Sequence, residues 1–397
     1  MLAPLEGNLV IDLSRVLAGP QCASMLGDLG ADVIKIEAIG TGDETRQWAP
    51  TIDGEATAFM SVNRNKRSLT VDLASERGQQ LVRRLVLSAD VVVENFRAGT
   101  MERWGLGYEQ LREEAPRLVY ATISAYGRTG ELASRPGYEA VLQAFSGLMS
   151  ITGEPDGLPV RAGTSLLDLG TGMVTAHAVM AALLDRERSG EGQLVETSLL
   201  ATAVTFLGYH AQAYLSAGEI PGRQGSGHAA VVPYRVYPCA GDDAVFVAAA
   251  NQRLWERLCR ALDLEHLLED ERFADVPARK QHRRELDEII GAVLLGMERD
   301  EILDRLNDAD VPVTPVHTVD EVLEHPQVRE VAAIRQVHHE GLGHDIDLVA
   351  SPFRGSRMNT EIRSAPPRLG EHTTQILREL GLSDAEVADL RDHGVVG

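Results

Sequence analysis

The chain has 397 residues, of which 44% are hydrophobic, and its 38 basic and 59 acidic side chains leave a formal net charge of −21. This length exceeds one ordinary core and predicts two domains. The negative charge argues against nucleic acid or an anionic membrane as the main partner.

No apolar run reaches about 18 residues without a charge, so no membrane span is predicted. The first residues lack the basic region and the cleavage site of a secretory signal. The three cysteines, Cys22, Cys239 and Cys259, have no metal-type spacing and suit a reducing cytoplasm. Cys22 and Cys259 stand among apolar residues and are expected in the core.

The first half of the chain alternates short apolar runs with helical stretches, the pattern of βαβ units in a parallel sheet. Strands are predicted at residues 9–13, 31–37, 69–73, 90–94, 118–124 and near 194, and helices at 21–29, 75–88 and 137–150. An open α/β sheet binds ligands beyond the carboxyl ends of its strands. The segments there are 15–19, 38–48, 95–99 and 125–135. The first turn carries Gly19-Pro20 but no GxGxxG, so a dinucleotide site lacks its phosphate turn.

Residues 159–197 contain an apolar helix that is predicted to begin just after Asp168 and to end near 188. From 173 to 184 it is apolar nearly all round, so it is expected deep in a core. Asp168 stands at its N-terminus, where the helix dipole favours an ionised carboxylate, and Gly170 and Gly172 leave room for a bulky partner. Two interpretations stay open on this stretch alone: an N-cap aspartate and a carboxylate nucleophile.

The composition changes after a further helix at 199–215. The glycine-rich loop at 218–227 is either a lid over a site or a flexible connection. Residues 232–238 and 244–248 predict a hairpin, helices follow, and a strand at 311–316 completes a small α+β unit near 330. Residues 342–370 are loop-rich, and helices near 373–380 and 385–392 close the chain. The predicted division is a large domain at 1–220, a small domain at 221–330 and a return to the large domain at 331–397.

Several motifs, in order along nearly the whole chain, resemble the class III CoA-transferase family, which includes formyl-CoA transferase and α-methylacyl-CoA racemase. They are LSRVLAGP, GADVIKIE, GDETR, NRNKRSLTVDL, DVVVENF, RPGYEAVLQAFSGLMSITG, RAGTSLLDLGTG and APPRLGEHT. The features SVNRNK, SGLMSITG and GSGHAAVVPY are most similar to the succinyl-CoA:glutarate (or hydroxymethylglutarate) branch. The resemblance implies an interlocked homodimer of two ring-like chains, with a Rossmann-like large domain. It also implies acyl-CoA and small carboxylic acids, dicarboxylates among them, as substrates, with no permanently bound cofactor or metal.

The resemblance places the family's nucleophilic aspartate on Asp168. It implies CoA contacts from seven residues: Val16, Ala18, Val71, Asn95, Phe96, Arg103 and Tyr138. It further implies a substrate side formed by Trp48, Glu139 and His228, with Arg46 or Arg64 holding a second carboxylate. Ala38 and Leu17 depart from relatives that carry polar residues at these places.

The alternative activity within the same family is a racemase or isomerase of acyl-CoA. A racemase needs two groups to remove and return the α-proton. Racemase relatives carry Gly-His-Asp where this chain has Gly137-Tyr138-Glu139, so the imidazole is absent here. The sequence therefore favours transfer of CoA between carboxylic acids.

Overall fold

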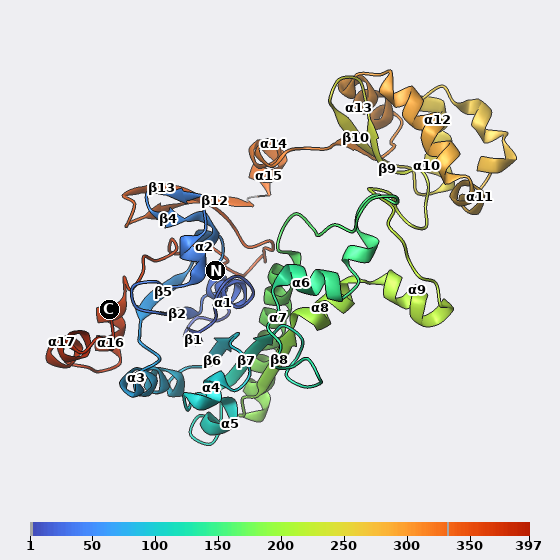
Figure 1. Cartoon of the computed structure of the whole chain (residues 1–397). Coiled ribbons are helices and arrows are strands. Elements are labelled where there is room, and N and C mark those ends of the chain that lie inside the picture. Colours follow the sequence, from blue (N-terminus) through green and yellow to red (C-terminus); the bar gives the residue numbers. More distant parts are fainter. Residues whose placement is uncertain (1–2, 332) are drawn as a thin grey trace. The chain divides into compact units, whose positions relative to one another are not determined.

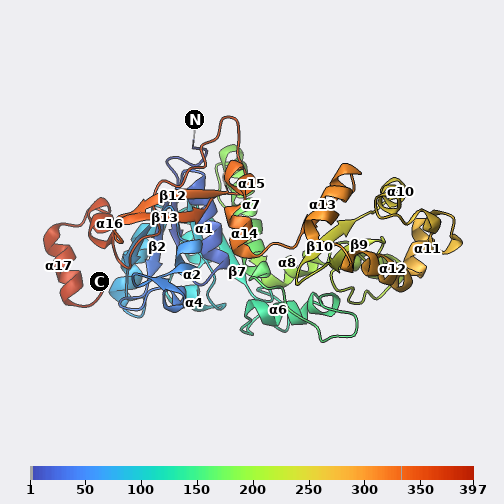
Figure 2. The same ribbon diagram turned by 90° about the horizontal axis from the view of Figure 1, so that it is seen from above.

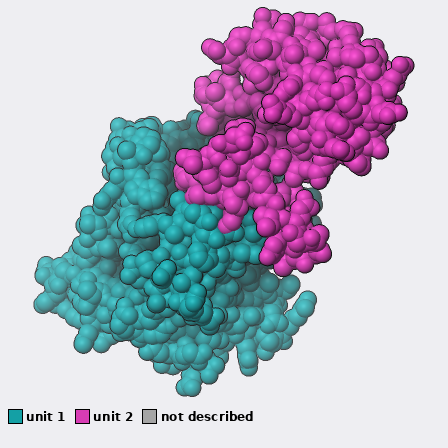
Figure 3. Space-filling model, turned by 45° about the vertical axis from the view of Figure 1, so that its right-hand side comes forward, with its two compact units in different colours: residues 1–146, 162–208, 326–397 teal, residues 147–161, 209–325 magenta. Residues whose placement is uncertain are grey.

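The computed structural model describes residues 3–331 and 333–397 and divides the chain into two compact units (Figure 3). Unit 1 comprises Met1–Ser146, Ala162–Gly208 and Pro326–Gly397, and unit 2 comprises Gly147–Arg161 and Tyr209–His325. Compared with the predicted division, unit 2 begins at Tyr209 and also takes in the excursion Gly147–Arg161. A pattern along the chain does not mark such an excursion, because both of its ends lie in loops.

Unit 1 is built on a six-stranded, fully parallel sheet with the order β5-β2-β1-β6-β7-β8 (Figure 1). The predicted α/β class with an open parallel sheet is confirmed. Its strands are β1 (Leu9–Asp12), β2 (Asp32–Glu37), β5 (Lys66–Thr70), β6 (Val91–Glu94), β7 (Val119–Ser124) and β8 (Leu194–Ser198). The strand order reverses between β1 and β6. This switch point is where open α/β sheets hold ligands.

Helices cover both faces of this sheet. On one face α1 (Ala18–Asp28) and α7 (Leu166–Ser189) pack along each other (Figures 1 and 2). The apolar core of the other face is closed by α3 (Glu76–Leu87), α4 (Thr100–Arg103), α5 (Tyr108–Leu111), α16 (Thr373–Glu379) and α17 (Asp384–Asp392). The remaining elements of unit 1 are η1 (Glu44–Gln47), β3 (Thr51–Ile52), β4 (Glu55–Ala56), α2 (Thr57–Ser61), α6 (Glu139–Phe145), α8 (Leu199–Phe206), α15 (Pro326–Glu330), β12 (Ile334–His339) and β13 (His344–Val349).

Unit 2 has its own core around an antiparallel three-stranded sheet, in which β10 (Ala244–Ala248) lies between β9 (Tyr234–Pro238) and β11 (Val313–Pro315). The predicted hairpin is β9 and β10. Helix α10 (Gln252–Ala261) packs its apolar side, with Trp255, into this core. The other elements are η2 (Met149–Ile151), α9 (Tyr209–Ala217), η3 (Glu265–Leu268), η4 (Glu271–Phe273), α11 (Val276–Gln281), α12 (Arg283–Leu295), α13 (Arg299–Asp308) and α14 (Val319–Glu324).

Several predicted elements differ from the structure, among them a strand, a helix and a loop-rich stretch. Strand β5 begins at Lys66 instead of residue 69, because a buried lysine opens it. The helix predicted at 199–215 is two helices, α8 and α9, since the left-handed backbone of Gly208, where φ is 52°, interrupts it. The stretch expected to be loop-rich contains β13, which pairs with β12 as an antiparallel hairpin.

Helix α7 is also exposed on one side. Met173, Val174 and Leu184 are 41%, 42% and 60% exposed, because the sheet and α1 cover only the opposite side of the helix. By length and composition alone this helix is apolar enough to cross a membrane, and half of that stretch is buried within the described residues. Core helices of globular proteins pass the same test, so this feature by itself decides nothing.

Candidate active site

A pocket of about 340 Å³ opens beyond the carboxyl ends of β1, β6 and β7, at the switch point of the sheet. All four segments predicted at this edge of the sheet contribute residues to this pocket or to a second pocket beside it, which is described below. It is lined by Arg15, Val16, Ala18, Glu44, Asn95, Phe96, Arg97, Ala98, Thr122, Ile123, Ser124, Ala125, Gly127, Arg128, Ala133, Ser134, Arg135, Pro136, Gly137, Tyr138, Glu139, Asp168 and Leu199. The pocket thus brings together Asp168 and six of the other predicted site residues.

Asp168 lies in the first turn of α7, two residues after the helix begins at Leu166. Burial, followed by the negative charge of Glu139, raises the pKa of Asp168 to about 7. The helix end was expected to favour the ionised carboxylate, but burial and the charge of Glu139 have the larger effect on its pKa. A carboxylate with this pKa is half ionised near neutral pH and is more basic than an exposed aspartate, which suits a nucleophile.

Glu139 stands at the start of α6 and is 6% exposed. Its Oε1 accepts hydrogen bonds from the Leu167 backbone N–H, at 3.3 Å, and from the Gln143 side chain. The Gln143 Oε1 in turn accepts the Ala162 N–H at 2.9 Å. Glu139 therefore fixes the entry to α7, one residue before Asp168. Its neighbour Tyr138 lies on the same pocket and is 72% exposed.

The two glycines after Asp168 serve helix packing. A Cβ at Gly170 would lie 2.4 Å from the Phe206 ring on α8, and one at Gly172 would lie 2.6 Å from the Ala18 carbonyl oxygen on α1. The two glycines were expected to leave room for a bulky ligand; in the structure they make room for helices α8 and α1 instead. Because Gly172 lets α7 approach the start of α1 so closely, the first turns of both helices reach the same pocket.

Two side chains, Asn95 and Asp43, bind the backbone of the turn between β1 and α1. The Arg15 N–H donates to Asn95 Oδ1 at 2.8 Å, and Asn95 Nδ2 donates to the Arg15 carbonyl at 2.7 Å. Val16 has φ of 69°, a conformation that a β-branched residue rarely adopts. The Asp43 carboxylate accepts the Val16 N–H, at 3.2 Å to each oxygen. Such a strained residue persists only where its surroundings enforce it.

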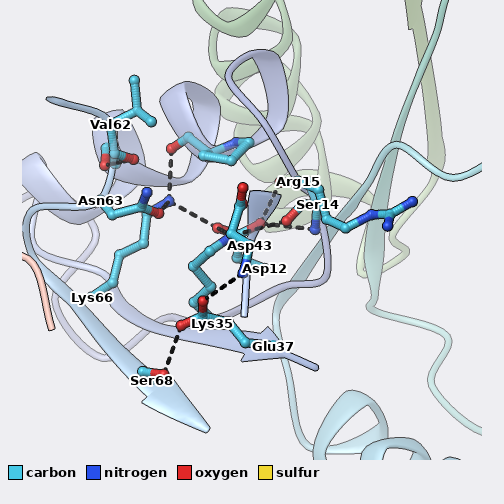
Figure 4. A network of polar contacts seen from close by, with 12 residues as sticks. Asp12, Ser14, Arg15, Lys35, Glu37, Asp43, Val62, Asn63, Lys66 and Ser68 are labelled. Carbon is cyan, nitrogen blue, oxygen red and sulfur yellow. Dashed lines mark hydrogen bonds and ion pairs between the residues drawn. The ribbon is translucent and has the colours of Figure 1, made fainter. Parts of the chain in front are cut away.

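A network of buried charges underlies this turn, on the sheet face that α1 covers (Figure 4). Lys35 Nζ lies 3.0 Å from Asp43 and donates to the Ser14 carbonyl at 2.9 Å. Lys66 Nζ donates to Asp12 and to the Pro20 carbonyl, each at 2.8 Å. Although burial alone has the opposite effect, these ammoniums hold the pKa of Asp12 below its usual value. Burial lowers the pKa of Lys66 to about 8. No local sequence pattern marks this network, because its members are far apart along the chain.

A second pocket adjoins the first beyond β1, β2, β5 and β6. Val71 and Phe96 both line it, and Phe96 packs edge-on against Trp104 with ring centroids 5.1 Å apart. Both predicted residues thus meet here, on an apolar and aromatic wall of the kind that a planar base packs against. Arg103 lies on α4 outside both pockets, where its guanidinium donates to Thr100 Oγ1 at 3.0 Å.

The two predicted carboxylate anchors are already engaged inside the structure. Arg46 donates to both oxygens of Glu37, at 2.7 and 2.8 Å, and its guanidinium stacks on Phe59. Arg64 donates to both oxygens of the buried Asp28, at 3.0 and 2.6 Å. Neither residue lines the pocket that holds Asp168. The structure therefore gives both guanidiniums intramolecular partners in place of a substrate.

Two further predicted site residues also lie off this pocket. Trp48 is 42% exposed and follows η1. His228 belongs to unit 2, where its ring lies 5.5 Å from the Tyr209 ring and 5.4 Å from the Tyr234 ring, and its Nδ1 accepts the Ala230 N–H. Within residues 3–331 and 333–397, no three His, Cys, Asp or Glu side chains gather as a metal-binding group.

These features define an α/β protein with a carboxylate at the head of a core helix, facing a pocket at the switch point of a parallel sheet. The model of CoA-transferase family III matches residues 5–373, and the chain belongs to this family. It is an enzyme of the CoA-transferase type.

Three similar proteins illustrate the match. The chain is 37% identical to succinyl-CoA:glutarate CoA-transferase of Homo sapiens, over 100% of this chain and 90% of that protein. It is 40% identical to succinate–glutarate CoA-transferase of Agrobacterium fabrum, over 95% and 96% of the two chains. The crystal structure of a CaiB/BaiF family protein from Brucella suis superposes with a TM-score of 0.86 at 36% identity, covering 96% of this chain and all of that one.

Proposed function

We propose that this enzyme moves CoA between dicarboxylic acids through an aspartyl-CoA thioester on Asp168. The observation that carries the proposal is the Asp168 carboxylate, which lines the pocket. Burial and the charge of Glu139 raise its pKa to about 7. The relatives named for succinyl-CoA and glutarate support dicarboxylates as the substrate class.

The proposed reaction exchanges one activated carbonyl for another. The Asp168 carboxylate attacks the thioester carbonyl of acyl-CoA, the carbon–sulfur bond breaks, and a mixed anhydride and CoA thiolate form. The thiolate then attacks the aspartyl carbonyl, which releases the first acid as its carboxylate and leaves an aspartyl-CoA thioester. The acceptor carboxylate repeats both steps in reverse and regenerates Asp168. Covalent catalysis of this kind divides one difficult exchange into easier steps.

Glu139 has a positioning role in this proposal. It accepts the Leu167 N–H and thereby holds the first turn of α7, and its negative charge raises the pKa of the neighbouring nucleophile. Among the described residues that line the pocket there is no histidine. This composition supports transfer over racemisation, which needs a second proton-transfer group.

The test is capture of the intermediate. After incubation with succinyl-CoA alone, hydroxylamine should convert Asp168 to its hydroxamate, which peptide mass spectrometry detects. Asp168→Asn should show no label and should lose several orders of magnitude in transfer rate while still binding CoA. Substantial transfer by Asp168→Ala would rule out the covalent route. Equal rates with glutarate and butyrate as acceptors would rule out the dicarboxylate preference.

A homodimer is part of the same proposal. Unit 1 exposes several large apolar side chains next to the pocket and along α7, and an exposed apolar area of this kind marks an interaction surface. These side chains are Tyr138, Val141, Phe145, Leu166, Met173, Val174, Leu184, Val204 and Phe206. A second copy of the chain, interlocked with the first as the family resemblance implies, is the partner we propose. The three buried, unpaired cysteines fit a reducing compartment, and we place the enzyme in the cytoplasm.

A further inference from the structure

The two pockets at the carboxyl edge of the sheet share three lining residues, Arg15, Glu44 and Phe96. One pocket holds Asp168, and the other holds the wall formed by Val71 and Trp104. A single elongated ligand that occupies both pockets must pass these three residues. Arg15 is the one cationic side chain that lines both pockets within the described residues.

The backbone of Arg15 is fixed although its side chain is not buried. Asn95 binds both the N–H and the carbonyl of Arg15, and Asp43 binds the N–H of the next residue. Asp43 is held in turn by the buried ammonium of Lys35. Figure 4 shows the Arg15 side chain extending away from this buried network. The network therefore fixes the backbone of a residue whose cationic side chain is half-exposed.

The Arg15 guanidinium is paired with Glu44, and a ligand can take the place of this carboxylate. The Arg15 guanidinium lies 3.6 Å from the Glu44 carboxylate, and the two side chains are 49% and 52% exposed. Ion pairs with this exposure contribute little stability, because water competes for both groups. The guanidinium also lies 5.0 Å from the centroid of Phe96, so it stays at the junction of the pockets.

Other cations near the pockets are less suited to a ligand that spans both. Arg128 is bound to three carboxylates, those of Glu94, Glu102 and Glu196. Lys35 is buried and lies between Asp12 and Asp43. Arg97 and Arg135 line only the pocket of Asp168.

We propose that Arg15 binds the diphosphate of acyl-CoA and that the phosphates replace Glu44 as its partner. This inference rests on the proposed function, which places the acyl group at Asp168 and leaves the nucleotide end for the second pocket. A guanidinium is suited to phosphate oxygens, because its planar N–H groups make paired, charge-assisted hydrogen bonds. Glu44 occupies the phosphate position in the absence of substrate and opposes binding by like charge.

The experiment compares succinyl-CoA with succinyl-pantetheine, which lacks the nucleotide and its phosphates. Arg15→Met should raise the KM for succinyl-CoA roughly ten- to a hundredfold with kcat nearly unchanged, and should leave the KM for succinyl-pantetheine unchanged. Arg15→Lys should recover part of the loss. Glu44→Gln should lower the KM for succinyl-CoA a few-fold, because it removes the competing carboxylate. Succinyl-3′-dephospho-CoA should show the same Arg15 effect, since the diphosphate is intact.

The matched control is Arg112→Met. Arg112 forms a similarly exposed ion pair with Glu109 on α5, away from both pockets, and its loss should change no kinetic constant. The proposal is overturned if Arg15→Met stays within twofold of the wild type on succinyl-CoA, or if it raises the KM for both substrates equally. Failure of the proposed function differs from these results, because the wild type itself would then not transfer CoA from succinyl-CoA.

Discussion

Replacing Glu139 by glutamine should shift the pH dependence of transfer toward acid. The pKa of Asp168 is about 7 instead of 3.8, a difference that corresponds to about 4 kcal/mol against the ionised form. Burial is the larger cause and Glu139 the second, so removal of the Glu139 charge should lower the pKa of Asp168 by about one unit. Near pH 6 the ionised fraction of Asp168 would then rise from about one tenth to about one half, and kcat/KM would rise about fivefold.

The substitution keeps an acceptor for the Leu167 N–H and for the Gln143 side chain, because a glutamine oxygen can still accept both. The measurement is kcat/KM from pH 5.5 to 8.5 at constant ionic strength, with circular dichroism at each pH to confirm folding. Ionisation of the substrate cancels, since both enzymes are compared on the same substrate. At pH 8 the two enzymes should have similar rates. If the acidic limb of the wild type lies near pH 4, or if the substitution leaves that limb in place, the electrostatic reasoning about Asp168 is refuted.

Three further outcomes are expected. Gly172→Ala should destabilise the fold by about 1–3 kcal/mol in thermal or denaturant unfolding, because its Cβ would meet the Ala18 carbonyl, whereas Gly163→Ala, with open space around it, should be nearly neutral. Arg64→Met should cost about 3–5 kcal/mol of stability, since it removes the guanidinium that pairs with the buried Asp28 carboxylate, and should leave the ratio of the rates with glutarate and butyrate unchanged. A changed preference would restore Arg64 as a substrate anchor. Light scattering at nanomolar concentration should give the mass of a dimer, and a folded monomer there would contradict the interlocked architecture.

The sequence identified the six strands of the parallel sheet of unit 1, although not their order. Its buried strands are short apolar runs and its helices have one apolar face, so local periodicity is enough to recognise both. The same local pattern placed Asp168 at a helix start, and the motifs around it indicated the family. Placement of the pocket also followed from sequence, because the carboxyl ends of parallel strands lie at one edge of the sheet.

Only the tertiary structure decided which charges are available to a ligand. Arg46 or Arg64 was expected to hold a substrate carboxylate, but Glu37 and Asp28 bind these two side chains inside the fold. Strand β5 begins at Lys66, three residues before the predicted start. A lysine does not fit an apolar pattern, and the residue that lets it be buried, Asp12, is 54 residues away along the chain. Charges of this kind are buried only where an opposite charge meets them, and a pairing between distant segments leaves no periodic signal along the chain. Arg15 had no distinguishing pattern either. Its position between two pockets arises from the junction of β1 with β6, which no stretch of sequence shows by itself.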